Sequence, residues 1–229
     1  MNTTWAWLAL IGLGAYHGIN PAMGWLFAVG LGLQENSRRA VLAALFPISL
    51  GHALSIGIFA GIVWIAQASL PPTPLKVAAG LILIGFGVFR LVRAKHPQWV
   101  GMRVGFRDLT LWSFLMATAH GAGLMLVPVL LGMNPDRASH GEQGMDMGMS
   151  MADMSHAQHA AMIQPQAPGL LVPVAAVLVH TLALLVVAAG IAIAVYQWVG
   201  LSVLRRAWLN LDLVWVITLV IAGVVILVV

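Results

Sequence analysis

The stretch Tyr16-His17-Gly18-Ile19-Asn20-Pro21-Ala22-Met23-Gly24 lies in the middle of a long apolar run, from Trp5 to Leu33. A helix over that run is long enough to cross a bilayer. The proline removes a backbone donor and clashes with the preceding turn, and the carbonyl groups that a break frees find no partner in lipid. The stretch therefore predicts a broken membrane helix that presents His17, Asn20 and Met23 to the interior of a bundle or to a pathway.

The composition of the whole chain points to the same class of protein. Of its 229 residues, 61% are hydrophobic and only 8% are charged. Repeated apolar runs of about 20 residues indicate transmembrane helices. The chain has no cysteine, which excludes a disulfide framework, a thiolate metal site and a cysteine nucleophile. The sequence thus predicts an all-α integral membrane protein.

Six apolar runs account for most of the chain, and we expect each to form a transmembrane helix. The predicted spans are Trp5–Leu33, Ala40–Ala68, Leu75–Leu91, Leu109–Gly132, Gly169–Val199 and Leu209–Val229. Nine of the eleven basic residues fall in the first, third and fifth connections between these spans or, for Arg90, at the end of the span that precedes the third connection. The positive-inside rule places those three connections in the cytoplasm.

This charge distribution predicts a multi-pass protein of the bacterial inner (plasma) membrane with both termini and the long fourth connection on the extracytoplasmic side. The net charge is +4. Topology signals and contacts with anionic lipid account for it. We therefore expect the lipid bilayer, and no nucleic acid, as a partner.

A short internal repeat relates the two halves of the chain. A His-Gly pair occurs in the first and fourth predicted spans, at His17 and His120, and a His-x-Leu pattern occurs in the second and fifth, at His52 and His180. An odd number of spans in each half inverts the second copy, as in many transporters with broken helices. We expect one transmembrane domain over 1–229, made of a first repeat over 1–95 and a second over 108–229, with broken first and fourth helices.

Four of the eight histidines lie inside predicted spans, whereas all seven acidic residues lie at span ends or in connections. A single buried histidine is usually structural, held by a hydrogen bond in a packed core. Four of them without carboxylate partners favour a metal site, because imidazole beside thioether suits copper, nickel or zinc. The predicted intramembrane ligands are His17, Asn20, Met23, His52, His120 and His180.

The fourth connection, over 133–168, is a second candidate site outside the membrane. It is rich in methionine and histidine and is otherwise polar. Thioethers select Cu(I) or Ag(I) over harder ions, and such tracts are typical of metal capture; the alternative is a low-complexity linker. The predicted ligands of this extracytoplasmic loop are His140, Met145, Met147, Met149, Met151, Met154, His156 and His159.

Two short segments resemble the motifs of the NicO nickel/cobalt transporters, within the LysE-like transporter superfamily. The segment from His17 to Met23 is similar to the first-helix motif His-Ala-Leu-Asp-Ala-Asp-His of that family, and the segment Leu50-Gly51-His52 to its Leu-Gly-His-Ser motif. The resemblance implies metal transport through a three-helix inverted repeat, with His17 and His52 at the family's histidines. Asn20, Ala22 and Met23 replace two aspartates and a histidine, which shifts the expected ion from nickel toward a softer one.

Together these features predict a transporter of a transition metal ion, captured by the outer loop and passed to the intramembrane site. Cu(I) is the favoured ion, with nickel, cobalt or zinc as alternatives. We expect no enzymatic activity. A membrane accessory protein that delivers copper to a cuproprotein is one alternative, and a periplasmic metallochaperone or cuproprotein is then the expected protein partner. A membrane cytochrome with haem held by histidine pairs is the other.

Overall fold

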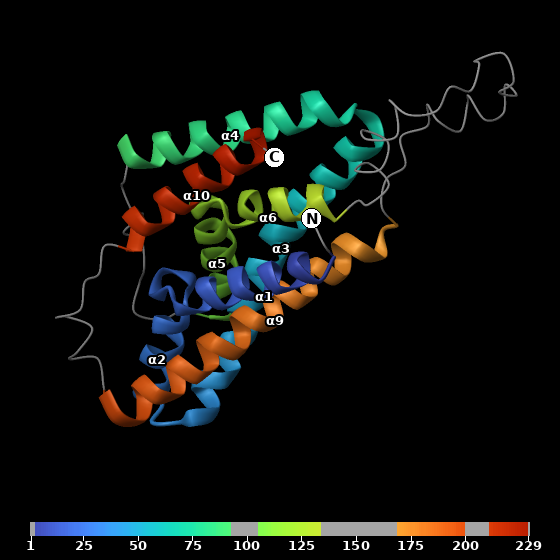
Figure 1. Ribbon diagram of the computed structural model, residues 1–229. Helices are drawn as coiled ribbons and strands as arrows, with labels where there is room; N and C mark the ends of the chain where they lie inside the picture. The colour runs from blue at the N-terminus through green and yellow to red at the C-terminus, as the bar shows by residue number, and fades with distance from the viewer. Residues whose placement is uncertain (1–2, 93–104, 134–168, 200–210, 229) are drawn as a thin grey trace, which may run out of the picture.

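The computed structural model describes residues 3–92, 105–133, 169–199 and 211–228, and every regular element in these ranges is helical. Figure 1 shows the arrangement, in which helices pack on helices, and the buried apolar residues of these ranges form two clusters. The elements are α1 (Thr3–Ile19), η1 (Pro21–Met23), α2 (Trp25–Gln34), α3 (Arg38–Ser69), α4 (Pro72–Val92), α5 (Phe106–His120), α6 (Ala122–Gly132), α9 (Leu171–Ala194), the π-helical η3 (Val195–Val199) and α10 (Leu211–Val228).

Three of the described helices are long and apolar enough to cross a membrane: Arg38–Ser69, Thr73–Val92 and Leu171–Trp198. The pair α5 and α6 makes a fourth span if the two helices are counted together. The chain is therefore a membrane protein, as predicted. The predicted count of six spans is not confirmed, because α2 and the part of α10 from Val216 are shorter apolar helices.

The first predicted break is present. Helix α1 ends at Ile19, and Asn20 caps the 3-10 turn η1 by accepting a hydrogen bond from the amide of Ala22 at 2.9 Å. Gly24 then adopts φ +116°, a left-handed conformation that is costly for residues with a side chain. The indole Nε1 of Trp25 donates to the carbonyl of Ile19 at 3.1 Å. This bond gives a partner to one of the carbonyl groups that the break frees.

The second break lies between α5 and α6, at the other His-Gly pair. Gly121 adopts φ +70°, and the two helices meet at an angle of 62°. The amide of Gly121 donates to carbonyl groups of α5, which closes the end of that helix. His120 is therefore the last residue of its helix, whereas α1 continues for two residues after His17.

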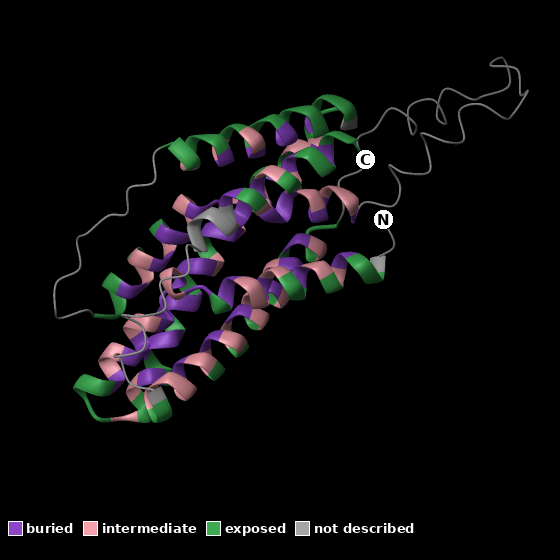
Figure 2. Cartoon of the chain, turned by 60° about the vertical axis from the view of Figure 1, so that its left-hand side comes forward, coloured by how far each residue is buried: buried purple, intermediate pink, exposed green. Residues whose placement is uncertain are grey.

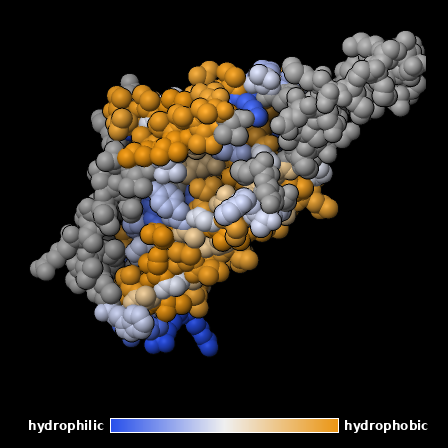
Figure 3. Space-filling view, in the orientation of Figure 1, coloured by the Kyte–Doolittle hydropathy of each residue, from blue (hydrophilic) through white to orange (hydrophobic). Residues whose placement is uncertain are grey.

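The helices pack in three main pairs. Helix α1 lies along α9, α3 lies along α5, and α4 lies along α10, while α3 and α9 also pack on each other. The two chain ends lie toward the same end of the bundle (Figure 1). Buried residues gather along the inward faces of these helices (Figure 2). The α4–α10 pair covers one side and shows a strongly apolar surface (Figure 3).

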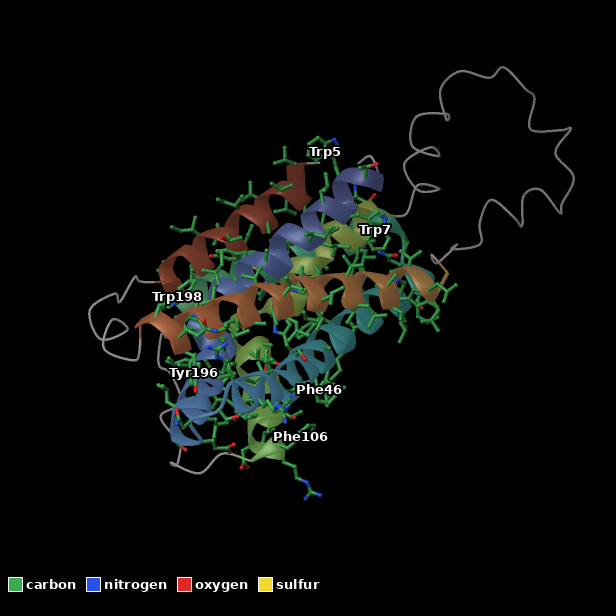
Figure 4. All side chains as sticks on the ribbon, turned by 90° about the horizontal axis from the view of Figure 1, so that it is seen from below. Trp5, Trp7, Phe46, Phe106, Tyr196 and Trp198 are labelled. Carbon is green, nitrogen blue, oxygen red and sulfur yellow. The ribbon has the colours of Figure 1, made fainter. Side chains whose placement is uncertain are left out.

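The exposed side chains suit a lipid environment. Trp5, near the start of α1, is 65% exposed, and Trp198, in η3, is 82% exposed. Figure 4 shows these two residues near opposite ends of the α1–α9 layer. Tryptophan is enriched at both membrane–water interfaces. The two side chains are therefore placed to anchor this layer at the two faces of a bilayer.

Glycines bring α1 against α9. A Cβ at Gly14 would overlap the carbonyl oxygen of His180 and lie 2.9 Å from the Cβ of Ala183. A Cβ at Gly18 would lie 2.6 Å from the carbonyl oxygen of Leu184. Small residues four apart allow two membrane helices to approach backbone to backbone. This close crossing sets the distance between the histidines that the two helices carry.

Candidate metal centre

Three histidines from three helices meet inside the bundle. His17 comes from the last turn of α1, His52 from the middle of α3 and His180 from α9, and each is 0% exposed. One ring nitrogen from each lies within 4.8 Å of the others. We refer to these residues as the histidine trio. Two nitrogen atoms bound to one ion at about 2.0–2.1 Å are at most about 4.2 Å apart, so a small inward shift of the rings would let the trio bind one ion.

The rings are arranged around a common centre. The ring centroids of His17 and His52 are 5.2 Å apart, those of His17 and His180 are 4.9 Å apart, and those of His52 and His180 are 5.7 Å apart. The rings of His52 and His180 are nearly parallel, at 7°, and that of His17 is steeply inclined to both. The separations are nearly equal, as a three-coordinate site requires.

The protonated nitrogen of His17 is fixed by the backbone. Its Nδ1 lies 2.7 Å from the carbonyl oxygen of Leu13, one turn earlier in α1. A carbonyl oxygen only accepts hydrogen bonds, so Nδ1 carries the proton and Nε2 has the lone pair. This is the usual second contact of a metal-binding histidine, which fixes both the tautomer and the ring orientation.

The rings of His52 and His180 are buried without this kind of anchor. Neither nitrogen of His52 has a hydrogen-bond partner among the described residues. The same holds for His180, although the carbonyl of Leu10 lies near its ring. A buried polar group without a hydrogen bond costs about 1–3 kcal/mol. A structural histidine would be bonded, so this arrangement fits ligands for an ion much better than core packing.

The surroundings of the trio carry no negative charge among the described side chains. Glu35 and Asp108, the two acidic residues whose side chains the structure describes, are both exposed. Asp108 instead caps α5 by accepting from the amide of Gly105 at 2.9 Å. The site would therefore hold an ion with three neutral nitrogen ligands and no compensating carboxylate.

The structure places the other three predicted intramembrane ligands in different settings. Asn20 is buried and its side-chain oxygen caps η1, a structural role that the sequence analysis missed. Met23 is buried in the apolar core cluster that also holds Met125. His120 is fully buried and its Nδ1 lies 2.8 Å from the carbonyl oxygen of Met116. None of the three belongs to the trio, and their roles as ligands stay predictions.

The predicted loop ligands, from His140 to His159, lie outside the described residues. Sequence reasoning also missed the groups that position the trio. The carbonyl of Leu13 orients His17, and Gly14 sets the approach of α1 to α9. The Gly14-x-x-x-Gly18 spacing is a readable signal for close helix packing, so the second of these could have been found.

Comparisons with known proteins give one partial similarity. A segment of 83 residues is 36% identical to the Heme A synthase of Methylorubrum extorquens (strain PA1) and covers 33% of this chain and 20% of that protein. No family model matches the chain, and no solved structure matches it. The chain thus matches a fifth of the length of that relative, and the predicted relation to nickel/cobalt transporters stays a prediction.

This similarity corrects one expectation. We expected no enzymatic activity, and Heme A synthase is an enzyme by its name. The expectation followed from the interpretation of the buried histidines as ligands of a transported ion. Such patterns do not distinguish a ligand to a transported ion from a ligand that serves a reaction, because both use the same imidazole nitrogen.

Proposed function

We propose that the chain transports a transition metal ion across the membrane, with Cu(I) as the favoured ion and the histidine trio as its intramembrane site. The observation that carries the proposal is the convergence of His17, His52 and His180, all fully buried, with ligand atoms within 4.8 Å of one another. Imidazole is a ligand for copper, nickel and zinc. A buried cluster of such ligands within helices long enough to span a bilayer supports a pathway for an ion.

The charge balance supports a monovalent ion. The cost of moving an ion from water into a low-dielectric interior rises with the square of its charge, and it is already large for a single charge. Three neutral imidazoles provide no negative charge to offset it, and no described acidic side chain is buried. Three nitrogen ligands can complete the coordination of Cu(I) or Ag(I), whereas Zn²⁺ takes a fourth ligand, either a side chain or a water.

The helix pairings support the proposed inverted repeat of six spans. The proposed repeat relates α1 and α2 to α5 and α6, α3 to α9, and α4 to α10. Under this relation, the α1–α9 pair corresponds to the α5–α3 pair. The α3–α9 pair and the α4–α10 pair each correspond to themselves. All four of these helix pairs are in contact in the structure. Two inverted halves around a central site are typical of secondary transporters.

The proposed orientation can be tested by cysteine labelling, because the chain has no cysteine of its own. Glu35 and Thr73 are exposed and lie just before and just after the long helix α3. In intact cells we expect the Glu35→Cys variant to be protected from an impermeant thiol reagent and the Thr73→Cys variant to react. Labelling of the Glu35→Cys variant without labelling of the Thr73→Cys variant would show that the orientation is the reverse of the proposed one.

The outer loop is proposed to collect the ion. We expect a synthetic peptide over 140–162 to bind Ag(I) more tightly than Ni²⁺ or Zn²⁺, because thioethers prefer soft ions. Competition with a chromogenic chelator would measure the affinities. In the protein, changing the methionines of this segment to leucine should reduce uptake at low ion concentration and leave it intact at high concentration. Tighter binding of nickel than of silver would contradict the soft-ligand argument.

The central experiment is metal analysis of the purified protein, with and without residues 133–168, followed by flux into sealed vesicles. We expect about one Cu(I) or Ag(I) to remain bound after the loop is removed, because the trio stays in place. Uptake by vesicles distinguishes transport from delivery of copper to a partner protein such as a cuproprotein or metallochaperone. A protein that binds the ion and shows no flux would support delivery.

The similarity to Heme A synthase favours a second candidate function, an enzymatic step on haem. The trio argues against haem at this position. A porphyrin held by His52 and His180 would lie between their two rings. The centroid of the His17 ring is 5.2 Å from that of His52 and 4.9 Å from that of His180, so His17 occupies the space beside the midpoint of the two rings, which the porphyrin would need. We expect purified protein from haem-supplemented cells to show no Soret band. A stoichiometric Soret band would favour the haem function over metal transport.

A further inference from the structure

His120 is the one fully buried histidine of the described helices that does not join the trio. The backbone holds its Nδ1 in the same way as that of His17. Each has its Nδ1 against the carbonyl oxygen four residues earlier, at 2.7 Å for His17 and 2.8 Å for His120. A carbonyl fixes the proton on Nδ1 in both, so both rings have the tautomer of a ligand that binds through Nε2.

The helix pairings make His120 the counterpart of His17. Exchanging the two halves of the chain replaces α1 by α5 and exchanges α3 with α9, and the four main pairings, α1–α9, α3–α5, α3–α9 and α4–α10, are preserved. His52 and His180 then change places, and their rings are nearly parallel at 7°. The trio uses only one of the two equivalent histidines.

The end of α5 lies beside His52 on α3. The hydroxyls of Ser55, one turn after His52, and Thr118, two residues before His120, are 2.9 Å apart. Ser113 of α5 donates to the carbonyl of Ile48 at 2.6 Å, and a Cβ at Gly51 would lie 2.9 Å from the amide of Phe114. His120 is thus carried on a helix that is tightly joined to the helix of a trio ligand.

The two helix breaks differ, and the difference explains why His17 belongs to the trio and His120 does not. Helix α1 continues two residues past His17, and Gly18 packs against α9. Helix α5 ends at His120, and Gly121, in a left-handed conformation, faces Phe86 of α4 and Leu219 of α10. At the two equivalent histidines, α1 and α5 therefore differ in how far they continue and in which helices they contact. In inverted-repeat transporters, the two halves exchange such conformations when the site opens to the other side.

We infer that the chain forms a second trigonal metal site, His52–His120–His180, in the conformation that faces the opposite side of the membrane. The inference rests on the proposed function. The ion keeps His52 and His180 as ligands throughout and exchanges His17 for His120 as the α1 and α5 halves exchange conformations. Each state has three neutral nitrogen ligands, so the ion has the same coordination number and the same ligand charge in both states.

The test compares His17→Ala, His120→Ala, the double variant and His52→Ala, with Ag(I) as the probe. Binding is measured by equilibrium dialysis of the full-length protein in detergent, and flux by uptake into sealed vesicles. We expect His120→Ala to bind Ag(I) like the unchanged protein and to lose at least about tenfold in flux. His17→Ala should bind more weakly, since only the other state can hold the ion, and should also lose flux. The double variant and His52→Ala should lose binding.

Met116→Leu serves as the matched control for the end of α5. Met116 is buried one turn before His120, and its carbonyl, which the change leaves in place, holds the imidazole. A volume-conserving change of this kind is well tolerated, so both binding and flux should be kept. Melting temperatures of the ion-free variants complete the set. We expect His120→Ala to melt within a few degrees of the unchanged protein.

The outcomes separate this inference from the function on which it rests. If the unchanged protein neither binds nor transports Ag(I), the proposed function fails. If it does both and His120→Ala transports at the unchanged rate, the second site is refuted while the first stands. A loss of flux in His120→Ala that comes with lost binding and a lower melting temperature identifies His120 as a structural residue and also overturns the inference.

Discussion

Replacing His52 by alanine should abolish ion binding and transport while the ion-free protein stays folded and loses little stability. His52 is fully buried and neither ring nitrogen has a hydrogen-bond partner among the described residues. Its removal therefore breaks no hydrogen bond and relieves an unsatisfied polar group, which offsets part of the lost packing. Changing a residue that only supports a ligand lowers metal affinity by about 10–100-fold. Removal of a direct ligand should therefore lower the affinity by more than ~100-fold.

The matched control is Ser55→Ala, one turn further along α3. Ser55 is buried and bonds to Thr118, so its loss should destabilise the protein by about 0.5–1.5 kcal/mol and leave Ag(I) affinity intact. Thermal unfolding of both variants without the ion, with dialysis against Ag(I), gives the two readouts. If His52→Ala unfolds the protein and Ser55→Ala does not, His52 is a core residue and the metal centre is wrong.

The second large effect is expected at Gly14, where alanine should both destabilise the protein and weaken ion binding. The added Cβ would overlap the carbonyl oxygen of His180, which is backbone and cannot turn away. Helices α1 and α9 must then separate, and overpacking of this kind costs about 1–3 kcal/mol. The same shift moves His17 away from His180, so Ag(I) affinity should fall together with the melting temperature.

Gly12→Ala is the control within the same helix. A Cβ at Gly12 meets nothing within 4 Å in the described structure, and alanine stabilises a helix interior by roughly 0.5–1 kcal/mol relative to glycine. We therefore expect Gly12→Ala to leave the melting temperature unchanged or raise it and to keep Ag(I) affinity. Equal effects of the two alanines would show that the α1–α9 crossing does not set the geometry of the site.

The sequence by itself determined the class of the protein and the places where its helices break. Apolar runs long enough to span a bilayer leave few alternatives to membrane helices, because lipid satisfies no backbone group. Pro21 cannot continue a helix interior, and Gly121 follows a histidine whose helix ends there. These are local properties of the chain, so periodicity, hydropathy and helix-breaking residues are enough to predict them. The pattern of histidines without buried acids also indicated a metal site.

Only the tertiary structure decided which histidines meet. The sequence offered four equivalent candidates, and the crossing of α1, α3 and α9 brought together His17, His52 and His180 and left His120 on α5. That choice depends on how closely two backbones approach at Gly14 and on the extra two residues of α1, which are properties of packing between distant segments. Asn20 shows the same limit, because an amide oxygen can bind an ion or cap a turn equally well. Here the backbone conformation at Pro21–Met23 placed an amide donor 2.9 Å from that oxygen and gave it the cap.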